Sequence, residues 1–151
     1  MTDTGPIGPD EETDAMDVPQ DQSPQPPFAV GFGIVLESAS KALLIAHLEV
    51  GAQHANRNNV MHGGAILALA DVLGGTAASL NLGPGEGTTT IESKTNFLRP
   101  VPLGQIVTAR TEPLHRGRKT QVWKTTVLRA DGKAAAITTQ TQLTLRKTTE
   151  G

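Results

Sequence analysis

The sequence predicts an α+β fold, in which a mostly antiparallel sheet wraps one long helix. One stretch near the middle of the chain is dense in alanine and leucine and carries a single charge, which is typical of a buried helix. The segments around it alternate apolar and polar residues or are rich in threonine, valine and isoleucine, which favours strands. Turn signals separate several of these segments, and strands joined by a hairpin pair with each other.

Residues 1–27 differ from the rest of the chain in composition. They hold six of the ten prolines and seven of the 15 acidic residues, but no Lys or Arg and no hydrophobic period. This composition is typical of a disordered tail, here acidic and proline-rich. We expect the folded domain to occupy residues 28–151, which contain all 13 basic residues but only eight acidic ones. Such a basic excess suits an anionic small ligand.

Composition and length exclude several classes of protein. The 151 residues fit one domain. The chain has no cysteine, which excludes disulfides, thiolate metal sites and cysteine nucleophiles, and we expect no metal. The N-terminus has no signal-peptide pattern and no stretch approaches the roughly 20 apolar residues that span a bilayer, so we expect a cytoplasmic protein without a membrane partner. Few aromatic residues and a modest basic excess argue against nucleic acid.

Two strands are expected before the long helix. Residues 28–36 are apolar, and residues 41–50 alternate between apolar and polar side chains. A polar, asparagine-rich loop follows at residues 51–61. The helix is expected over residues 63–80, despite the cost of two glycines in its interior. Its low charge suggests burial on all sides.

Four strands are expected after the helix, at residues 88–98, 105–114, 120–128 and 134–145. Asp131-Gly132 predicts a hairpin between the last two strands, and Arg116-Gly117 predicts a turn between the middle pair. The expected order is therefore two strands, one helix and four strands, without an internal repeat.

Asp71 is the main candidate for chemistry, because an ionised carboxylate on an apolar helix is costly to bury unless it is paired, hydrogen-bonded or beside a cavity. The alternative is a structural role, capping a loop or facing solvent. The helix begins with His62-Gly63-Gly64. The first N–H groups of a helix lack internal partners and carry the positive end of the dipole, so they can form an oxyanion site. Alternatively, the glycines only allow close packing.

The spacing of Gly63 and Asp71 adds a constraint. They are eight residues apart, a rise of about 12 Å along a helix. An oxyanion donor and a nucleophile or base must both lie roughly 3 Å from the reacting group. If both residues act, the site combines Gly63 of one subunit with Asp71 of another. This predicts an obligate dimer with two equivalent sites.

Together, Asn56, His62-Gly63-Gly64, Asp71 and the strand end from Asn96 to Pro100 resemble a known family. They are similar to the hotdog-fold acyl-CoA thioesterases of the phenylacetate-degradation (PaaI-like) group, which includes a 4-hydroxybenzoyl-CoA thioesterase branch. The resemblance covers about residues 28–145. It implies a hotdog fold that forms homodimers and usually homotetramers. It also implies an acyl-CoA substrate and no cofactor, since coenzyme A is part of the substrate.

The resemblance implies roles for five residues. The N–H at the position of Gly63 polarises the thioester carbonyl, and the acid at the position of Asp71, from the partner subunit, is the nucleophile or the general base. Asn56 matches a loop amide that assists near the carbonyl or the water. His62 matches a residue that shapes the start of the helix, and Thr90 matches a hydroxyl that can orient a water.

Other matching positions concern substrate binding. Gly87, Thr88 and Thr89 match backbone that lines the substrate channel. Arg118 and Lys119 match nucleotide contacts, and basic side chains suit the phosphates of coenzyme A. Simpler alternatives are available, since threonine runs are ordinary in strands and basic residues are ordinary in solvated turns.

Hydrolysis of a thioester needs few catalytic groups, because a thiolate is a good leaving group. The pKa of the corresponding thiol is near that of cysteine, about 8.5. Some relatives of the 4-hydroxybenzoyl branch have Glu where this chain has Asp71, and a hydroxyl residue where it has Gly75. We therefore favour the PaaI-like branch, with an aryl or medium-chain acyl group. Two other functions stay open: a non-catalytic acyl-CoA-binding module, and a hotdog hydratase or dehydratase, which His62 at the helix start does not favour.

Overall fold

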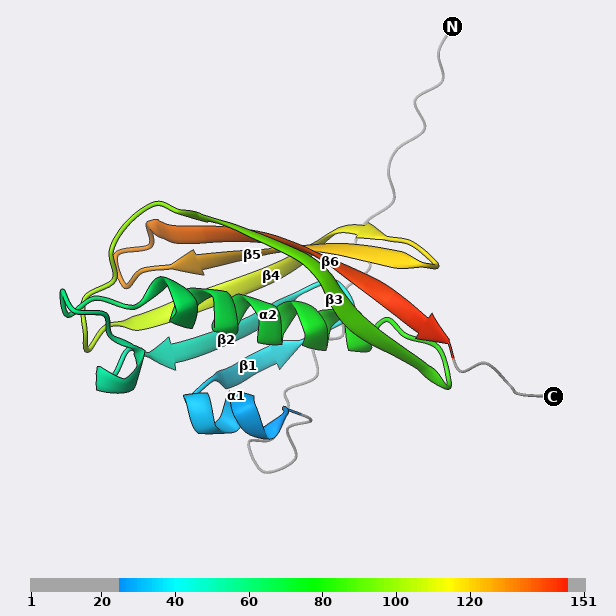
Figure 1. Cartoon of the computed structure of the whole chain (residues 1–151), viewed down its shortest axis with the longest axis horizontal. Coiled ribbons are helices and arrows are strands. Elements are labelled where there is room, and N and C mark those ends of the chain that lie inside the picture. Colours follow the sequence, from blue (N-terminus) through cyan, green and yellow to red (C-terminus); the bar gives the residue numbers. More distant parts are fainter. Residues whose placement is uncertain (1–24, 147–151) are drawn as a thin grey trace, which may run out of the picture.

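A computed structural model describes residues 25–146 (Figure 1). Six antiparallel strands form one sheet that packs against a 17-residue helix, α2 (Gly63–Ser79). The tail predicted at residues 1–27 lies outside the described residues as far as residue 24. In the described part, no helix is both long and apolar enough to cross a membrane.

The chain before α2 forms α1 (Pro27–Phe32), β1 (Val35–Ala39), β2 (Leu44–Glu49) and the short 3-10 helix η1 (Ala52–His54). The strand predicted for residues 28–36 is therefore wrong over its first part. Proline at the first helical position is pre-set for a helix, and Gly33 ends α1 in the left-handed region at φ 89°. Phe28 and Phe32 stack with ring centroids 5.4 Å apart, which is the i, i+4 spacing of a helix.

The chain after α2 forms β3 (Glu86–Phe97), β4 (Ile106–Arg116), β5 (Thr120–Leu128) and β6 (Ala134–Arg146). Both predicted turns are confirmed. The N–H of Gly117 donates to the Thr120 carbonyl, and Gly132, at φ 79°, occupies the β5–β6 turn. In that turn, the backbone N–H of Lys133 donates to Asp131 at 3.0 Å and holds the pKa of the Asp131 carboxyl below its ordinary value.

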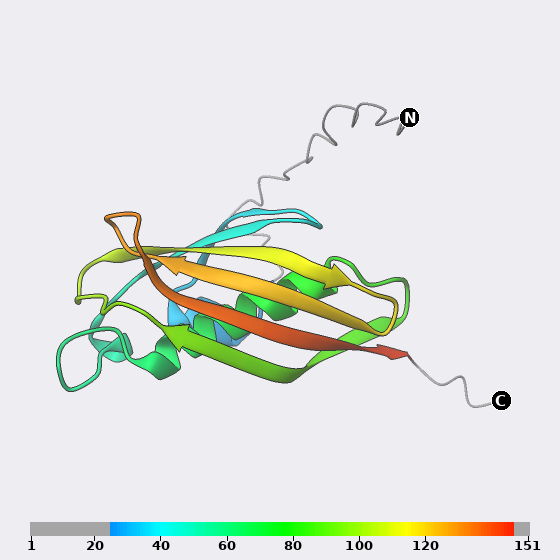
Figure 2. The ribbon, with the colours of Figure 1, turned by 90° about the horizontal axis from the view of Figure 1, so that it is seen from above.

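The strand order is β1-β2-β4-β5-β6-β3, so β1 and β3 are the two edges (Figure 2). Although β3 and β4 follow one another in sequence, they do not pair. Instead β3 pairs with β6, from Glu86 opposite Arg146 to Phe97 opposite Ala136. This pairing places β3 next to α2. The outer edge of β3 is unpaired in the described chain.

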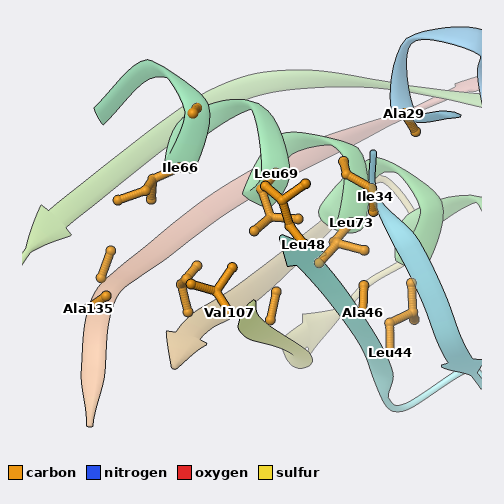
Figure 3. Packing of buried hydrophobic residues seen from close by; sticks show 14 of the residues in the cluster. Ala29, Ile34, Leu44, Ala46, Leu48, Ile66, Leu69, Leu73, Val107 and Ala135 are labelled. Carbon is orange, nitrogen blue, oxygen red and sulfur yellow. The ribbon is translucent and has the colours of Figure 1, made fainter. Parts of the chain in front are cut away.

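The core lies between α2 and one face of the sheet (Figure 3). Leu69 and Leu73 of α2 meet Leu48 and Val107, and each of these side chains is at most 1% exposed. Burying one such side chain stabilises the fold by about 1.5–3 kcal/mol. The expectation that the helix is buried on all sides is wrong for the single chain, since the sheet covers only one side. Gly64, Leu67, Asp71 and Ser79 are exposed.

Candidate active site

Asp71 lies on the exposed side of α2, where the helix meets β3. The Thr90 hydroxyl donates a hydrogen bond to Asp71 Oδ1 at 2.8 Å, and the Gln140 amide Nε2 donates to the same oxygen at 3.4 Å. Among the described residues, nothing donates to Oδ2. The carboxylate is therefore held by one oxygen, and the other oxygen is available to a ligand.

The pairing of β3 with β6 positions Thr90. Gln142 lies opposite Thr90, and a bulge follows between Thr90 and Glu92. The Gln142 amide Nε2 donates to Thr90 Oγ1 at 2.7 Å, and Thr88 Oγ1 donates to Gln142 Oε1 at 3.1 Å. Since the Thr90 hydroxyl accepts from Gln142, its own proton is directed to Asp71. In this geometry Thr90 orients the carboxylate itself.

A cavity of about 650 Å³ lies beside this carboxylate. One part of its lining is polar, with Asp71 and the threonine run at residues 88–90. The other part is apolar, and includes Phe28 of α1 together with Val72 and Leu80. A carboxylate that borders a largely apolar cavity is the arrangement expected of a small-molecule site. The structure thus places Thr88, Thr89 and Thr90 on the lining of the same cavity as Asp71, and Thr90 contacts the carboxylate directly.

The start of α2 leaves one N–H group unused. His62 is the N-cap residue, and its Nδ1 accepts from the Gly64 N–H at 2.8 Å. The Ala65 and Ile66 N–H groups donate to the His62 carbonyl. The Gly63 N–H makes no hydrogen bond within the described residues. Its freedom and its place at the positive end of the helix suit an oxyanion.

Gly63 borders a second cavity, of about 370 Å³, which Phe97 and Leu98 also line. A Cβ atom on Gly63 would lie 3.3 Å from the Phe97 ring, closer than side chains ordinarily pack. Gly63 thus faces the end of β3, whereas Asp71 faces Thr90 in its middle. Within one chain the two residues border different cavities, as their spacing predicts.

Asn56 stabilises the loop before α2. Its Oδ1 accepts from the Asn58 N–H at 2.8 Å and from the Val60 N–H at 3.4 Å. The side-chain amide nitrogen donates to no described residue, so it is the part of Asn56 left for a ligand. The structure does not bring Asn56 to the cavity beside Asp71.

His54 was missed at the sequence level, because a histidine in a polar loop gives no signal of burial. It is 1% exposed. Its Nδ1 accepts from the Gly51 N–H at 3.0 Å, and its Nε2 donates to the Phe32 carbonyl at 2.7 Å. Its own carbonyl accepts from the His62 N–H at 2.7 Å. His54 therefore joins α1 to the residue that caps α2.

Gln140 and Gln142 were also missed. They occupy alternate positions of β6, and both point inward with 1% exposure. Polar residues at consecutive inward positions of a strand are a signal, since an ordinary strand buries apolar side chains there. Only the pairing of β6 with β3 shows that these glutamines reach Asp71 and Thr90.

The predicted phosphate contacts lie apart from this cavity. Arg118 and Lys119 are exposed in the β4–β5 turn, and the Lys119 carbonyl accepts from the Thr144 N–H of β6 at 2.8 Å. Neither side chain lines the cavity beside Asp71. In the described part of the chain, no cluster of three His, Asp or Glu side chains could hold a metal ion.

Comparisons with protein families, known proteins and solved structures identify relatives of this chain. A model of the thioesterase superfamily matches residues 58–136. The proofreading thioesterase EntH of Klebsiella pneumoniae is 34% identical over 101 residues, which are 67% of this chain and 73% of that protein. The structure of the E. coli PaaI protein from the phenylacetic acid degradation operon is 25% identical, with a TM-score of 0.72, and the match covers 80% of this chain and 86% of that one. The structure of smu.793 from Streptococcus mutans, bound to acetyl CoA, is 27% identical with a TM-score of 0.69, over 76% of this chain and 92% of that one.

Proposed function

Because this chain belongs to the thioesterase superfamily and is a thioester hydrolase, we propose that it cleaves acyl-CoA at a site built from Asp71 and Gly63. The family resemblance and the hotdog fold predicted from the sequence are confirmed by the matching family and by the likeness to PaaI. The observation that carries the assignment of the site is the Asp71 carboxylate, which two donors hold by Oδ1 beside a cavity.

The proposed reaction uses these two groups. The Gly63 N–H stabilises the negative charge that develops on the thioester oxygen. Asp71 either attacks the carbonyl carbon through Oδ2, which gives a mixed anhydride and the coenzyme A thiolate, or removes a proton from an attacking water. In the first route, water hydrolyses the anhydride and restores the carboxylate. The free acid and coenzyme A are the products of both routes.

We place this site between two copies of the chain. Gly63 lies against Phe97, and Asp71 lies against Thr90, seven residues earlier on the same strand. The outer edge of β3 has no partner strand in the described chain. If β3 pairs antiparallel with β3 of a second copy, the Phe97 end of each strand lies beside the Thr90 part of the other. Gly63 of one copy then approaches Asp71 of the other.

Exposed apolar side chains support this interface. Ile91, Phe97 and Leu98 are 55%, 56% and 49% exposed, and Leu67 on the adjacent face of α2 is 38% exposed. An apolar patch along an unpaired strand edge is an association surface. We therefore propose a homodimer as the minimal active unit, and a homotetramer as the full assembly that the family resemblance implies.

For the acyl group, we propose the cavity beside Asp71. Phe28, Val72 and Leu80 offer apolar contacts to an aryl or medium-chain acyl group, and the volume of about 650 Å³ is that of a small-molecule pocket. The likeness to a protein bound to acetyl CoA supports coenzyme A as the carrier. Arg118 and Lys119 are proposed to contact its phosphates, and the Asn56 amide nitrogen to assist near the carbonyl.

The test is release of free thiol from a panel of aryl- and alkyl-CoA thioesters. We expect hydrolysis by the native protein and a loss of at least about a hundredfold in kcat for Asp71→Asn. Asp131→Asn, which changes an exposed carboxylate in the β5–β6 turn, is the matched control and should keep native kcat. Equal rates for Asp71→Asn and the native protein would remove Asp71 from the mechanism. Binding of acyl-CoA without any thiol release would favour the non-catalytic binding module.

A further inference from the structure

We infer that Gln140 is a positioning residue for Asp71, and that Gln142 supports it through Thr90. Together with Thr90, Gln140 fixes Oδ1 of the carboxylate and so presents Oδ2 to the substrate. This inference rests on the proposed function, because it assumes that Asp71 is the reacting acid. It assigns to the two buried glutamines of β6 a task that the fold alone does not require.

The Gln140 side chain is in an unfavourable environment. Its carboxamide is buried, and its Oε1 has no hydrogen-bond partner among the described residues. A buried acceptor without a partner destabilises a fold. A leucine would fill similar space between α2 and β6 without that cost. Packing therefore does not explain a glutamine at this position. The hydrogen bond from Gln140 Nε2 to Asp71 Oδ1, at 3.4 Å, does explain it.

The helix α2 has a glycine opposite the Gln140 side chain. Gly74 is buried in the interior of α2, where glycine is unfavourable. A Cβ atom on Gly74 would overlap the Gln140 carboxamide. Gly74 lies three residues after Asp71, on the neighbouring part of the same helix face. The glycine thus leaves room for the amide at the point where the amide reaches Asp71, so one contact accounts for two residues that are otherwise unfavourable.

The hydrogen bonds around Thr90 and Asp71 run in one consistent direction. Gln142 donates to Thr90 Oγ1 and accepts from Thr88 Oγ1, which fixes the orientation of its own amide. The Thr90 proton is thereby directed to Asp71 Oδ1. Both donors to Asp71 approach the same oxygen, one from β3 and one from β6. Hydrogen-bond networks of this kind, here anchored by two buried glutamines, hold a reacting group within the narrow range of orientations that catalysis needs.

The test compares kcat, KM and thermal unfolding for the native protein and Gln140→Leu. We expect kcat to fall by about ten- to a hundredfold, because the carboxylate loses its orientation, with KM within about twofold of the native value. The midpoint of thermal unfolding should stay equal or rise, since the variant no longer buries an unpaired oxygen. A purely structural role of Gln140 would instead lower the midpoint.

Two further variants sharpen the result. Gly74→Ala should lower kcat in the same way with Gln140 still present, because the added methyl group displaces the amide. Gln121→Leu is the matched control. Gln121 is also buried, but its amide is satisfied by Trp123 and the Ala78 carbonyl, so this change should lower the unfolding midpoint and leave kcat native.

The outcomes separate the two proposals. If the native protein hydrolyses acyl-CoA and Asp71→Asn does not, native kcat in Gln140→Leu overturns the positioning role alone. A loss of kcat that only accompanies a lowered unfolding midpoint overturns it as well. If the native protein releases no thiol, or if Asp71→Asn is as active as the native protein, the proposed function fails and the positioning role fails with it.

Discussion

At the scale of single residues, the neighbours of Asp71 bind only one of its two carboxylate oxygens. Thr90 and Gln140 both donate to Oδ1 of Asp71, and no described residue donates to Oδ2. A carboxylate with both oxygens engaged would be a structural group. The free Oδ2 atom is the basis of the proposed role of Asp71, which is to attack a carbonyl carbon or to accept a proton from water.

Gly75 is expected to set the size of the acyl group. It lies one turn after Asp71 and lines the same cavity, and a Cβ atom there would meet nothing within 4 Å. A leucine at this position can extend into the cavity. We expect Gly75→Leu to raise KM at least about tenfold for aryl- and medium-chain acyl-CoA, as removal of pocket volume does. The kinetics with acetyl-CoA should change far less, and an equal change for all acyl lengths would place the acyl group elsewhere.

Which site residues the sequence could predict depended on whether their signal is local. Asp71 stands out as the charge in an apolar helix, and Gly63 follows a cap residue, so both were visible within one segment. The threonines of β3 were included because of the family resemblance. The contacts of Gln140 depend on the pairing of β6 with β3, and those of His54 depend on a loop that meets α1. No pattern within their own segments indicates these contacts.

At the scale of elements, α2 and the strands β4, β5 and β6 follow their sequence patterns closely, because each is long and its pattern is strong. The strand predicted for residues 28–36 is wrong over residues 28–32, which belong to α1, because a short apolar run does not distinguish a strand from a helix. The partner of β3 could not be predicted from the order of the strands in the sequence, since β3 pairs with β6, the last strand of the chain, and not with β4. The expected burial of α2 on all sides is wrong for the single chain, because the sheet covers only one side of the helix.

The assignment of Pro27–Phe32 as a helix that ends at Gly33 can be tested by its effect on stability. Gly33 adopts φ 89°, a left-handed conformation that costs other residues about 1–2 kcal/mol. We expect Gly33→Ala to lower the free energy of unfolding by about that amount, measured by urea denaturation. Gly31→Ala is the matched control: it lies within the helix with open space around its Cβ, and should be neutral or slightly stabilising. An unchanged stability for Gly33→Ala would argue that α1 does not end there.

At the scale of the whole molecule, the single chain holds the two halves of the proposed site apart along β3: Gly63 lies against Phe97 at the end of the strand, and Asp71 lies against Thr90 in its middle. The unpaired edge of β3 and its apolar side chains are the surface that a second copy would cover. If the site is shared in this way, a monomer of this protein is inactive.

A charge on this edge is expected to break the assembly. Ile91→Lys places a lysine on the outer part of β3, where charge opposes edge-to-edge pairing. We expect a monomer by light scattering and a loss of thioesterase activity. Ile106→Lys on β4 changes an isoleucine of the same 55% exposure, and it should keep at least the dimer and its activity. A monomeric Ile91→Lys variant with native kcat would contradict a site shared between subunits.

The most direct test of the shared site is to restore activity by mixing two inactive variants. Asp71→Asn removes the acid, and Gly63→Pro removes the oxyanion N–H at a helix position that accepts proline. After unfolding and refolding the variants together in equal amounts, half of the dimers are mixed, and each mixed dimer has one intact site. We therefore expect thiol release at about a quarter of the native rate. If the mixture stays as inactive as the separate variants, while native protein refolded in the same way recovers, Asp71 and Gly63 do not meet across a dimer.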